Sequence, residues 1–349
     1  MKKVISIVLF SLGSIVGYSQ GGGVESIALA AEDAGLLAKN YVNPFVKGLM
    51  YDLNSGWYTT AKTHNKFGFD LTINPSLSFV PSSEQFFSFN QDDYRYLSLP
   101  DGETRIPTVM SESEHETLIR VSIPHEGGTY KVAEFNMPKG IAGDLPLNAV
   151  PVPMAQIGVG LFANTDVKLR LVPNIDIADE FEFNLFGLGV QHDLTQYFKA
   201  ENSFLNVSLL AAFTNMKAVY AIENDASFEN VEVRNGEAEF KLNTWTIQGI
   251  ASLDFKLITF YGALGYNHGS TAVKMKGEYI LTYDVESAGG VPIDEVSETI
   301  YNPVSHDFKA SGMRGTIGTR LNLGFFKIFG DYTFQEYNTL TAGIAFSFN

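Results

Sequence analysis

The stretch 66-KFGFDLTINPSLSFV-80 alternates without a break between two kinds of side chain. Its odd positions are all apolar, from Phe67 to Phe79, and its even positions are all polar or small, from Lys66 to Ser78. A period of two residues predicts a β-strand with one apolar and one polar face. The stretch exceeds the usual globular strand of about 5–6 residues. It suits a tilted membrane-spanning strand of about 9–11 residues with an overhang.

The same alternation recurs in later parts of the chain. Clear examples are residues 155–162, 166–172, 313–325 and 326–335, and looser ones are 203–215, 245–255 and 257–268. Segment 181–191 has a similar composition, but the sequence does not fix its phase. The connections alternate between tight links and long polar loops, of which 81–150 is the longest. Short turns at one rim and long loops at the other are typical of an outer-membrane β-barrel.

The chain is therefore predicted to be all-β, a transmembrane antiparallel β-barrel over residues 66–349 with a short helical N-terminal plug. Counting strands backwards from the C-terminus gives ten, and places both termini of the barrel at the short-turn, periplasmic side. Region 81–150 is interpreted as an extracellular or lumenal excursion. Its stretches 117–123 and 129–135 form a hairpin that either spans the membrane or folds over the mouth. The prediction is an even number of 10–14 strands.

The polar faces of these strands carry charged side chains in mid-strand. Facing lipid, an Arg or Lys at mid-depth costs about 2–4 kcal/mol, so these groups are expected to face the lumen. The predicted lumen-facing network consists of Asp70, Lys168, Arg170, Arg314, Arg320, Lys327 and Asp331. Because both signs occur, the network is interpreted as paired charges that fill the barrel or hold a plug, and a polar conduction path is the alternative.

The two ends of the chain carry export and assembly signals. Residues 1–20 combine Lys2 and Lys3 with an apolar run and a small-residue end, which predicts a cleaved signal peptide. The C-terminal strand has a polar-x-Gly-x-x-apolar-x-apolar order that resembles the signal read by the barrel assembly machinery. This order is set by Thr341, Gly343, Phe346 and Phe348. Together they predict the cell outer membrane of a Gram-negative bacterium, with outer-membrane lipid as a partner.

Composition excludes several other classes of protein. The chain has 349 residues, no cysteine and a formal net charge of −15. Disulfides and thiolate sites are therefore absent, and a nucleic-acid partner is not expected because such surfaces are basic. After the signal no apolar run of 18 residues occurs, which argues against a helical membrane protein.

Residues 21–65 precede the first strand and are interpreted as a plug or hatch. Residues 25–39 are rich in Ala and Leu with helical spacing, and Pro44 is expected to end or kink this element. The lumen is one location for such a segment, and a periplasmic amphipathic helix is the alternative.

This N-terminal region resembles the FadL-type family of long-chain fatty acid and hydrocarbon transporters. The resemblance rests on Glu32-Asp33-Ala34-Gly35 and on Asn43-Pro44, with Phe45 where the family usually has Ala. It covers residues 25–80, and beyond them only the barrel architecture. The chain also resembles outer-membrane barrels of gliding-group bacteria that keep this architecture. The resemblance implies a plug carrying Glu32, Asp33, Asn43 and Pro44, and passage of hydrophobic small molecules.

The sequence gives little sign of catalysis. None of its six histidines has metal-ligand spacing, and no HExxH motif occurs, so no enzyme activity, cofactor or metal is predicted. The leading hypothesis is binding or transport of hydrophobic small molecules in a FadL-like manner. The alternative is a non-transporting barrel scaffold in an outer-membrane assembly or secretion complex, with other outer-membrane proteins as partners.

Overall fold

The computed structural model describes most of the chain after the predicted signal peptide. The described residues are 31–348 without 101, 125–129, 138, 178–180, 199–203, 223–230, 288–290 and 303. The predicted signal peptide, residues 1–20, and the first part of the predicted plug, residues 21–30, lie outside them.

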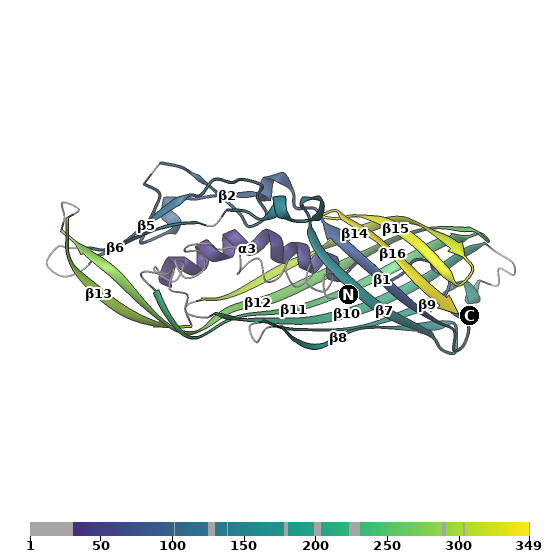
Figure 1. Ribbon diagram of the computed structural model, residues 1–349. Helices are drawn as coiled ribbons and strands as arrows, with labels where there is room; N and C mark the ends of the chain where they lie inside the picture. The colour runs from purple at the N-terminus through teal and green to yellow at the C-terminus, as the bar shows by residue number, and fades with distance from the viewer. Residues whose placement is uncertain are drawn as a thin grey trace.

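Ten antiparallel strands of the described chain close into a ring (Figure 1). In ring order these are β1 (Phe69–Ser78), β7 (Val150–Gly160), β8 (Thr165–Ile177), β9 (Phe181–Asp193), β10 (Leu205–Ile222), β11 (Val231–Asp254), β12 (Ile258–Glu286), β14 (Val304–Leu323), β15 (Phe326–Phe334) and β16 (Thr339–Phe348). β16 pairs with β1, so the strand that ends the chain also closes the ring. The predicted transmembrane antiparallel barrel is thereby confirmed.

One rim of the ring has mostly short connections, and we call it the short-turn rim. The links β7–β8, β11–β12 and β14–β15 are two to four residues long and lie here. β1 begins at this rim and β16 ends at it, because Phe69 is opposite Phe348. The link β9–β10 is longer and contains η7 (Thr195–Tyr197).

Beyond the other rim the chain builds a second region, which we call the extension. It consists of α3 (Ala31–Leu53), residues 79–149, β13 (Pro292–Tyr301) and the far ends of β9 to β12 and β14 (Figure 1). Residues 79–149 contain β2 (Phe86–Ser88), β3 (Leu97–Ser98), β4 (Arg105–Pro107), β5 (Leu118–Pro124), β6 (Tyr130–Asn136), η2 (Ser82–Glu84), η3 (Gln91–Asp93), η5 (Ala142–Asp144) and η6 (Pro146–Asn148).

The excursion between β1 and β7 adds no strand to the ring. Its hairpin β5–β6 joins the far end of β12, where Tyr130–Val132 pair with Asp284–Glu286. The hairpin was predicted either to span the membrane or to fold over the mouth. The strand pairing excludes the spanning position, because the hairpin lies outside the ring.

Helix α3 lies along the inside of the extension (Figure 1). Its inward side chains join a large apolar core, which includes Leu37, Tyr41, Phe45, Val46, Leu49, Met50, Leu97, Ile106, Val121 and Tyr279. Pro44 lies inside the helix, so of the two outcomes predicted for it, an end or a kink of this element, the end is wrong. Because the turns after Pro44 bury so much apolar surface, their packing offsets the lost backbone hydrogen bond. Among the described helices, none is both long and apolar enough to cross a membrane.

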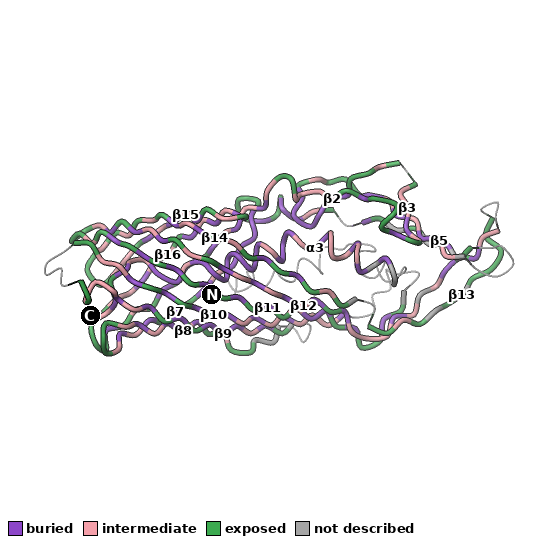
Figure 2. The backbone as a smooth tube through the Cα atoms, turned by 180° about the vertical axis from the view of Figure 1, so that it is seen from behind, coloured by how far each residue is buried: buried purple, intermediate pink, exposed green. Residues whose placement is uncertain are grey.

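The ring and the extension place apolar side chains on opposite faces of the same strands. Even-numbered residues of β12 point outward in both regions: Phe260 and Leu264 are exposed on the ring, and Lys274 is exposed on the extension. Odd-numbered residues point inward, with Thr259 buried in the ring and Val273 buried in the extension. Figure 2 shows this alternation of burial along the strands.

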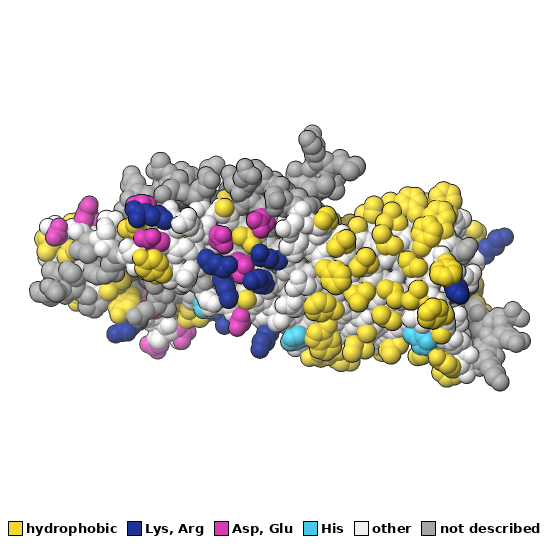
Figure 3. All heavy atoms as spheres, turned by 90° about the horizontal axis from the view of Figure 1, so that it is seen from below, with side chains coloured by type: hydrophobic (Ala, Val, Ile, Leu, Met, Phe, Trp, Pro, Cys, Tyr) yellow, Lys and Arg dark blue, Asp and Glu magenta, His cyan; other side chains and the backbone are white. Residues whose placement is uncertain are grey.

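The outside of the ring is an apolar belt. Its exposed members include Leu71, Ile73, Ile157, Leu188, Phe213, Ile247, Leu264, Ile317 and Ile328. Figure 3 shows apolar side chains over the ring, whereas charged side chains gather over the extension. The belt ends at one level, where Phe213 is opposite Trp245 and Tyr266 is opposite Met313. An outward apolar band edged by aromatic residues is what lipid requires.

Candidate functional site

Residues 54–65 lead from the end of α3 through the ring to β1, and we call them the plug segment. Gly56 begins the turn with a φ of +70°, and a Cβ there would collide with the side chain of Asn74. Glycine is therefore required at this position. Trp57 follows and is fully buried, next to Gly187 and Gly189 of β9, where a Cβ would come within about 3 Å of the indole.

Arg170 of β8 binds the end of the helix from the wall of the ring. Its Nη1 donates to the carbonyl of Leu53 at 2.9 Å, and its Nη2 donates to the carbonyl of Ser55 at 2.7 Å. Its guanidinium also lies 3.6 Å from the ring centroid of Trp57. The last turn of α3 carries no basic residue of its own. A cation at the negative end of a helix, bonded to its free carbonyls, stabilises that end.

Arg314 of β14 holds the same turn from another part of the wall. Its Nη1 donates to the carbonyl of Asn54 at 2.8 Å, and its Nη2 donates to Oγ of Ser55 at 3.1 Å. Neither Arg314 nor Arg170 has a carboxylate partner within the described part of the chain. The sequence had suggested pairing of opposite charges, whereas these two arginines bind main-chain oxygens of the plug.

Two further cations contact the plug segment nearer to the short-turn rim. Lys168 donates to the carbonyl of Trp57 at 2.7 Å, and Arg320 donates to Oγ1 of Thr59 at 3.1 Å. Asp331 is buried on β15 and accepts a hydrogen bond from the hydroxyl of Tyr261 at 2.9 Å. Four of the seven predicted residues therefore contact the plug segment from the ring wall, and a fifth, Asp331, is buried in that wall.

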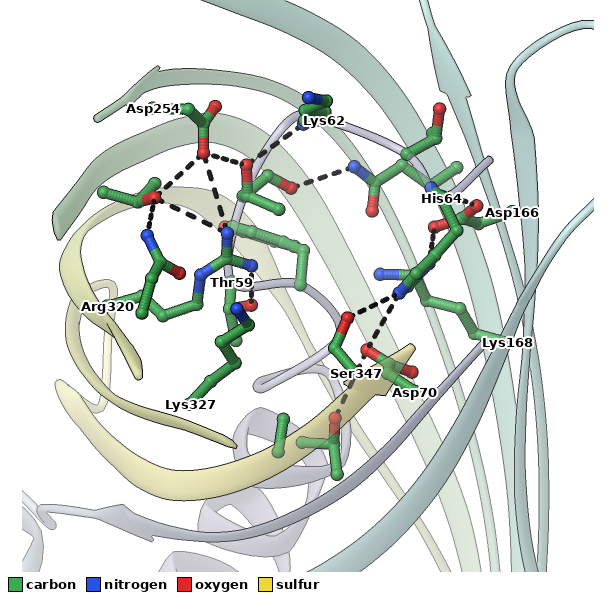
Figure 4. Close-up of a pocket in the computed structure, with 18 of the residues that line it drawn as sticks. Thr59, Lys62, His64, Asp70, Asp166, Lys168, Asp254, Arg320, Lys327 and Ser347 are labelled. Atoms are coloured by element: carbon green, nitrogen blue, oxygen red, sulfur yellow. Dashed lines mark hydrogen bonds and ion pairs between the residues drawn. The ribbon is translucent and has the colours of Figure 1, made fainter. Parts of the chain in front are cut away.

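The other two predicted residues, Asp70 and Lys327, lie close to the short-turn rim (Figure 4). Asp70 accepts a hydrogen bond from the backbone N–H of Gly158 at 2.9 Å. Lys327 is partly exposed and donates to the carbonyl of Gly324 at 2.5 Å. Lys327 thus lies at the rim, where it bonds to the β14–β15 turn rather than to the plug segment.

His64 lies near the end of the plug segment and was not singled out as a site residue from the sequence. Its backbone N–H and its Nδ1 each lie 2.9 Å from an oxygen of Asp166, and its Nε2 lies 3.4 Å from Oγ of Ser347. Asp254, also not singled out, accepts from Thr60 at 2.8 Å. One pattern in the sequence could have pointed to the contact with His64: Asp166 shares the polar face of its strand with Lys168.

The N-terminal residues taken from the family resemblance lie on α3. Asp33 accepts backbone hydrogen bonds from Tyr96 and Leu97, so it fixes the excursion to the helix. Pro44 is buried and Asn43 partly buried, next to the core of the extension. The side chain of Glu32 lies outside the described residues.

The predicted assembly residues lie on β16 as the alternation requires. Phe348 is exposed and stacks on Phe69 of β1, with centroids 5.0 Å apart. Phe346 lies beside Phe326, and Gly343 lies on the inward face, where a Cβ would meet the ring of Phe329. The aromatic residues at the end of β16 thus form part of the belt at the short-turn rim.

A second polar cluster ties α3 to the loops above the ring. Lys47 donates to Glu84 at 3.2 Å and to Glu336 at 2.7 Å, while Tyr51 donates to Glu336 and Tyr337 donates to Glu84 at 2.6 Å. Burial alone would raise the pKa of Glu336, but the bonds from Lys47 and Tyr51 outweigh it, so this pKa lies below its usual range. The cluster therefore holds α3 against the excursion, through Glu84, and against the β15–β16 loop, through Glu336.

The described residues also bear on the predicted absence of a metal site. No group of three or more metal-ligating side chains occurs among the residues that the structure describes. His115 contacts Glu103 on the exposed surface, and His125 lies outside the described residues. The features that the structure does bring together are a ring wall rich in cations and a plug that presents carbonyls to it.

Comparison with known proteins places this architecture in a family. A family model described as "Family of unknown function (DUF6588)" matches residues 1–348. The chain belongs to this DUF6588 family. No curated protein matches the chain significantly.

Among solved structures, similar chains are membrane barrels. Ail, the attachment invasion locus protein of Yersinia pestis, is 11% identical with a TM-score of 0.26, and the match covers 81% of this chain and 100% of Ail. The transport unit of the autotransporter AIDA-I from Escherichia coli is 9% identical with a TM-score of 0.30, covering 89% and 98%. The translocator domain of NalP from Neisseria meningitidis is 9% identical with a TM-score of 0.24, covering 82% and 90%. The evidence for a barrel in this DUF6588 chain is its own strand pairing and apolar belt.

Proposed function

We propose that this protein is an outer-membrane barrel whose resting state is closed, and that it anchors the extension as a docking surface on the cell exterior. One observation carries this proposal. The plug segment passes through the ring, and Arg170 and Arg314 bind three consecutive carbonyls and a hydroxyl of residues 53–55 across it. Buried arginines with these partners resist displacement, because losing them would strand buried donors.

The shape of the extension supports a role as a scaffold. β12 has 29 residues, and only its first part carries the apolar belt, so the remainder projects beyond the membrane. The extension has its own apolar core around α3 and a charged outside, as a soluble domain has. Such a domain would present a fixed surface to other outer-membrane proteins. The proposal assigns no enzyme activity to it.

FadL-like transport of hydrophobic small molecules is the second candidate. It is favoured by the course of the N-terminal segment, which runs from the extension through the ring to the short-turn rim as one continuous stretch. A shift of that stretch would open a path along the whole barrel. The closed state described above would then be one end of a transport cycle.

Conductance in planar lipid bilayers separates a closed scaffold from a pore. Purified protein should show no steady conductance, whereas the double variant Arg170→Gln with Arg314→Gln should open frequently because its plug has lost both anchors. Arg234→Gln, at an exposed arginine of the extension, is the matched control and should stay closed. Steady conductance of the unaltered protein would overturn the closed resting state.

Mass spectrometry on protein extracted in mild detergent separates the two candidate functions. Stoichiometric protein partners without a lipid-like ligand would support the scaffold. A stoichiometric fatty or hydrocarbon ligand on an isolated barrel would support transport instead.

A further inference from the structure

A hollow of about 340 Å³ opens inside the ring at the short-turn rim (Figure 4). It lies below the plug segment, whose residues Tyr58 to His64 form its roof, and the ring strands form its walls. The strand β16, the tight turn β11–β12 and the neighbouring ends of β14 and β15 complete its edge. The hollow therefore faces the solvent on the short-turn side and is separated from lipid by the wall.

The charges around the hollow differ from those of the whole chain. Its lining contains five cationic side chains and three carboxylates, an excess of two positive charges, although the chain carries a net charge of −15. The five cations are Lys62, Lys168, Lys256, Arg320 and Lys327. A recess with one excess sign and low-dielectric walls concentrates ions of the opposite sign.

The three carboxylates of the lining are already engaged by the protein. Asp166 accepts from the backbone and the imidazole of His64, and Asp70 accepts from the backbone of Gly158. Asp254 accepts from four side chains, those of Thr60, Asn206, Ser252 and Thr259. None of these hydrogen bonds comes from a lysine or arginine across the hollow.

The cations, in contrast, keep unused donors. No described carboxylate lies in ion-pair range of Lys62, Lys256 or Lys327, and the bond that Lys327 makes goes to the carbonyl of Gly324. Arg320 is 3.7 Å from Asp254, a loose contact, and the hydrogen bonds of its guanidinium go to the hydroxyls of Thr59 and Thr259 rather than to a carboxylate. Arg320 and Lys327 lie side by side in Figure 4, close enough to repel each other.

We propose that this hollow binds a phosphate group, with Arg320, Lys327 and Lys256 as its ligands. A phosphomonoester carries a charge of about −1.5 to −2 near pH 7 and three acceptor oxygens. It would supply partners to the unused donors and relieve the repulsion between neighbouring cations. This site is independent of whether the barrel anchors a scaffold or transports. In an outer-membrane barrel it would take its ligand from the periplasmic side.

Calorimetric titration of the full folded chain in nonionic detergent micelles tests the proposal. The probe is inorganic pyrophosphate, added against sodium chloride of equal ionic strength. We expect saturable binding of one equivalent, and about a tenfold rise in Kd for Lys327→Gln and for Lys256→Gln, because each loses a charge-assisted bond. Both lysines lie at the rim with partly or fully exposed side chains, so the variants should fold.

Lys274→Gln and Lys309→Gln are the matched controls, since both lysines are exposed on the extension. They should leave the Kd unchanged. Absence of saturable binding at equal ionic strength, or an equal loss in the controls, would overturn the proposal.

Two further probes identify the source of the phosphate. Glycerol phosphate offers the group on a soluble molecule, and phosphatidic acid mixed into the micelles offers it on a lipid. Tighter binding of the first, dependent on Lys327, would assign a soluble periplasmic ligand. Tighter binding of the second with the same dependence would assign a lipid headgroup that reaches over the rim.

Discussion

The ring and the extension use the same strands with opposite chemistry. Inside the ring β9 presents Gln191 and β14 presents Arg314 to a plug held by hydrogen bonds, while the outside is apolar. Inside the extension the same two strands present Leu185 and Phe308 to the apolar core around α3, while the outside is charged. The difference shows that the surroundings of each region, lipid or water, decide which face of a strand carries its apolar residues.

The switch of the apolar residues from the inward to the outward face is visible in the sequence of β9. Phe183 and Leu185 are buried in the extension, whereas Phe186 and Leu188 are exposed on the ring. The apolar period therefore slips by one residue between 185 and 186 without any bulge in the strand's pairing with β10. This slip explains why segment 181–191 has no single phase, and it marks the edge of the belt.

The largest effect is expected in the core of the extension. Phe45→Ala would remove a fully buried ring from α3 and should cost about 3–5 kcal/mol. Because both tryptophans, Trp57 and Trp245, lie in the ring, their fluorescence should change little while the extension becomes protease-sensitive. Simultaneous loss of the tryptophan signal would show that the two regions do not differ in what stabilises them.

A charge placed on one outward face sharpens the comparison along a single strand. Ile317→Arg puts a cation in the belt of β14 and should cost about 2–4 kcal/mol. Ser305→Arg, on the same face of β14 within the extension, should be close to neutral. The folded fraction in native membranes, read by heat-modifiable gel mobility, compares them. Equal losses would contradict the assignment of the belt.

Asp52 lies at the junction between the two regions, where its protonation is expected to affect stability. It is fully buried at the end of α3, accepts from Ser78 at 2.8 Å, and has a second oxygen without a partner among the described residues. Burial raises the pKa of Asp52 well above its usual value. Stability is therefore expected to fall as pH rises from the usual value toward the raised one, by about 1.4 kcal/mol for each unit between them.

Asp52→Asn removes this titration and keeps the oxygen that Ser78 binds, so it should stabilise the protein at neutral pH and flatten the pH profile. Urea unfolding between pH 4 and 8 measures it, with exposed Asp92→Asn as the control. A variant less stable than the unaltered protein at every pH would contradict the account.

The smallest effect is expected at the cluster above the ring. The pKa of Glu336 is lowered, so its contribution is present above its unfolded pKa and is lost as pH falls through the folded value. Because its side chain is 43% exposed, solvent screens the pair with Lys47, and Glu336→Gln should cost under about 1 kcal/mol. The loss should shrink further in high salt. Glu295→Gln on β13 is the exposed control.

The sequence allows the ring to be predicted in detail. Residues 66–80 alternate strictly and residues 313–325 nearly so, and both faces are assigned correctly; the ten strands counted backwards from the C-terminus are the ten that close the ring. These predictions succeed because a period of two residues is a local property of the chain. The extension is different, since the pairing of β6 with the end of β12 joins residues about 150 positions apart.

The plug contacts could be predicted only in part. The inward direction of Arg170 and Arg314 follows from the cost of charge in lipid, but their partners are main-chain carbonyls of residues 53–55, which have no signature in the sequence. The continuation of α3 past Pro44 was missed for a related reason. Local propensity argues against it, and only the core of the extension, formed by distant segments, outweighs that propensity.

The most direct test of the central claim measures what surrounds the outward faces on either side of the belt's edge. The chain has no cysteine, so single cysteines at Ile317, Met313, Lys309 and Ser305 of β14 can carry spin labels without background. Collision with oxygen and with a polar nickel complex, measured in lipid vesicles, reports lipid or water at each label. The account predicts lipid at 317, the edge at 313, and water at 309 and 305. The same surroundings at all four positions would contradict it.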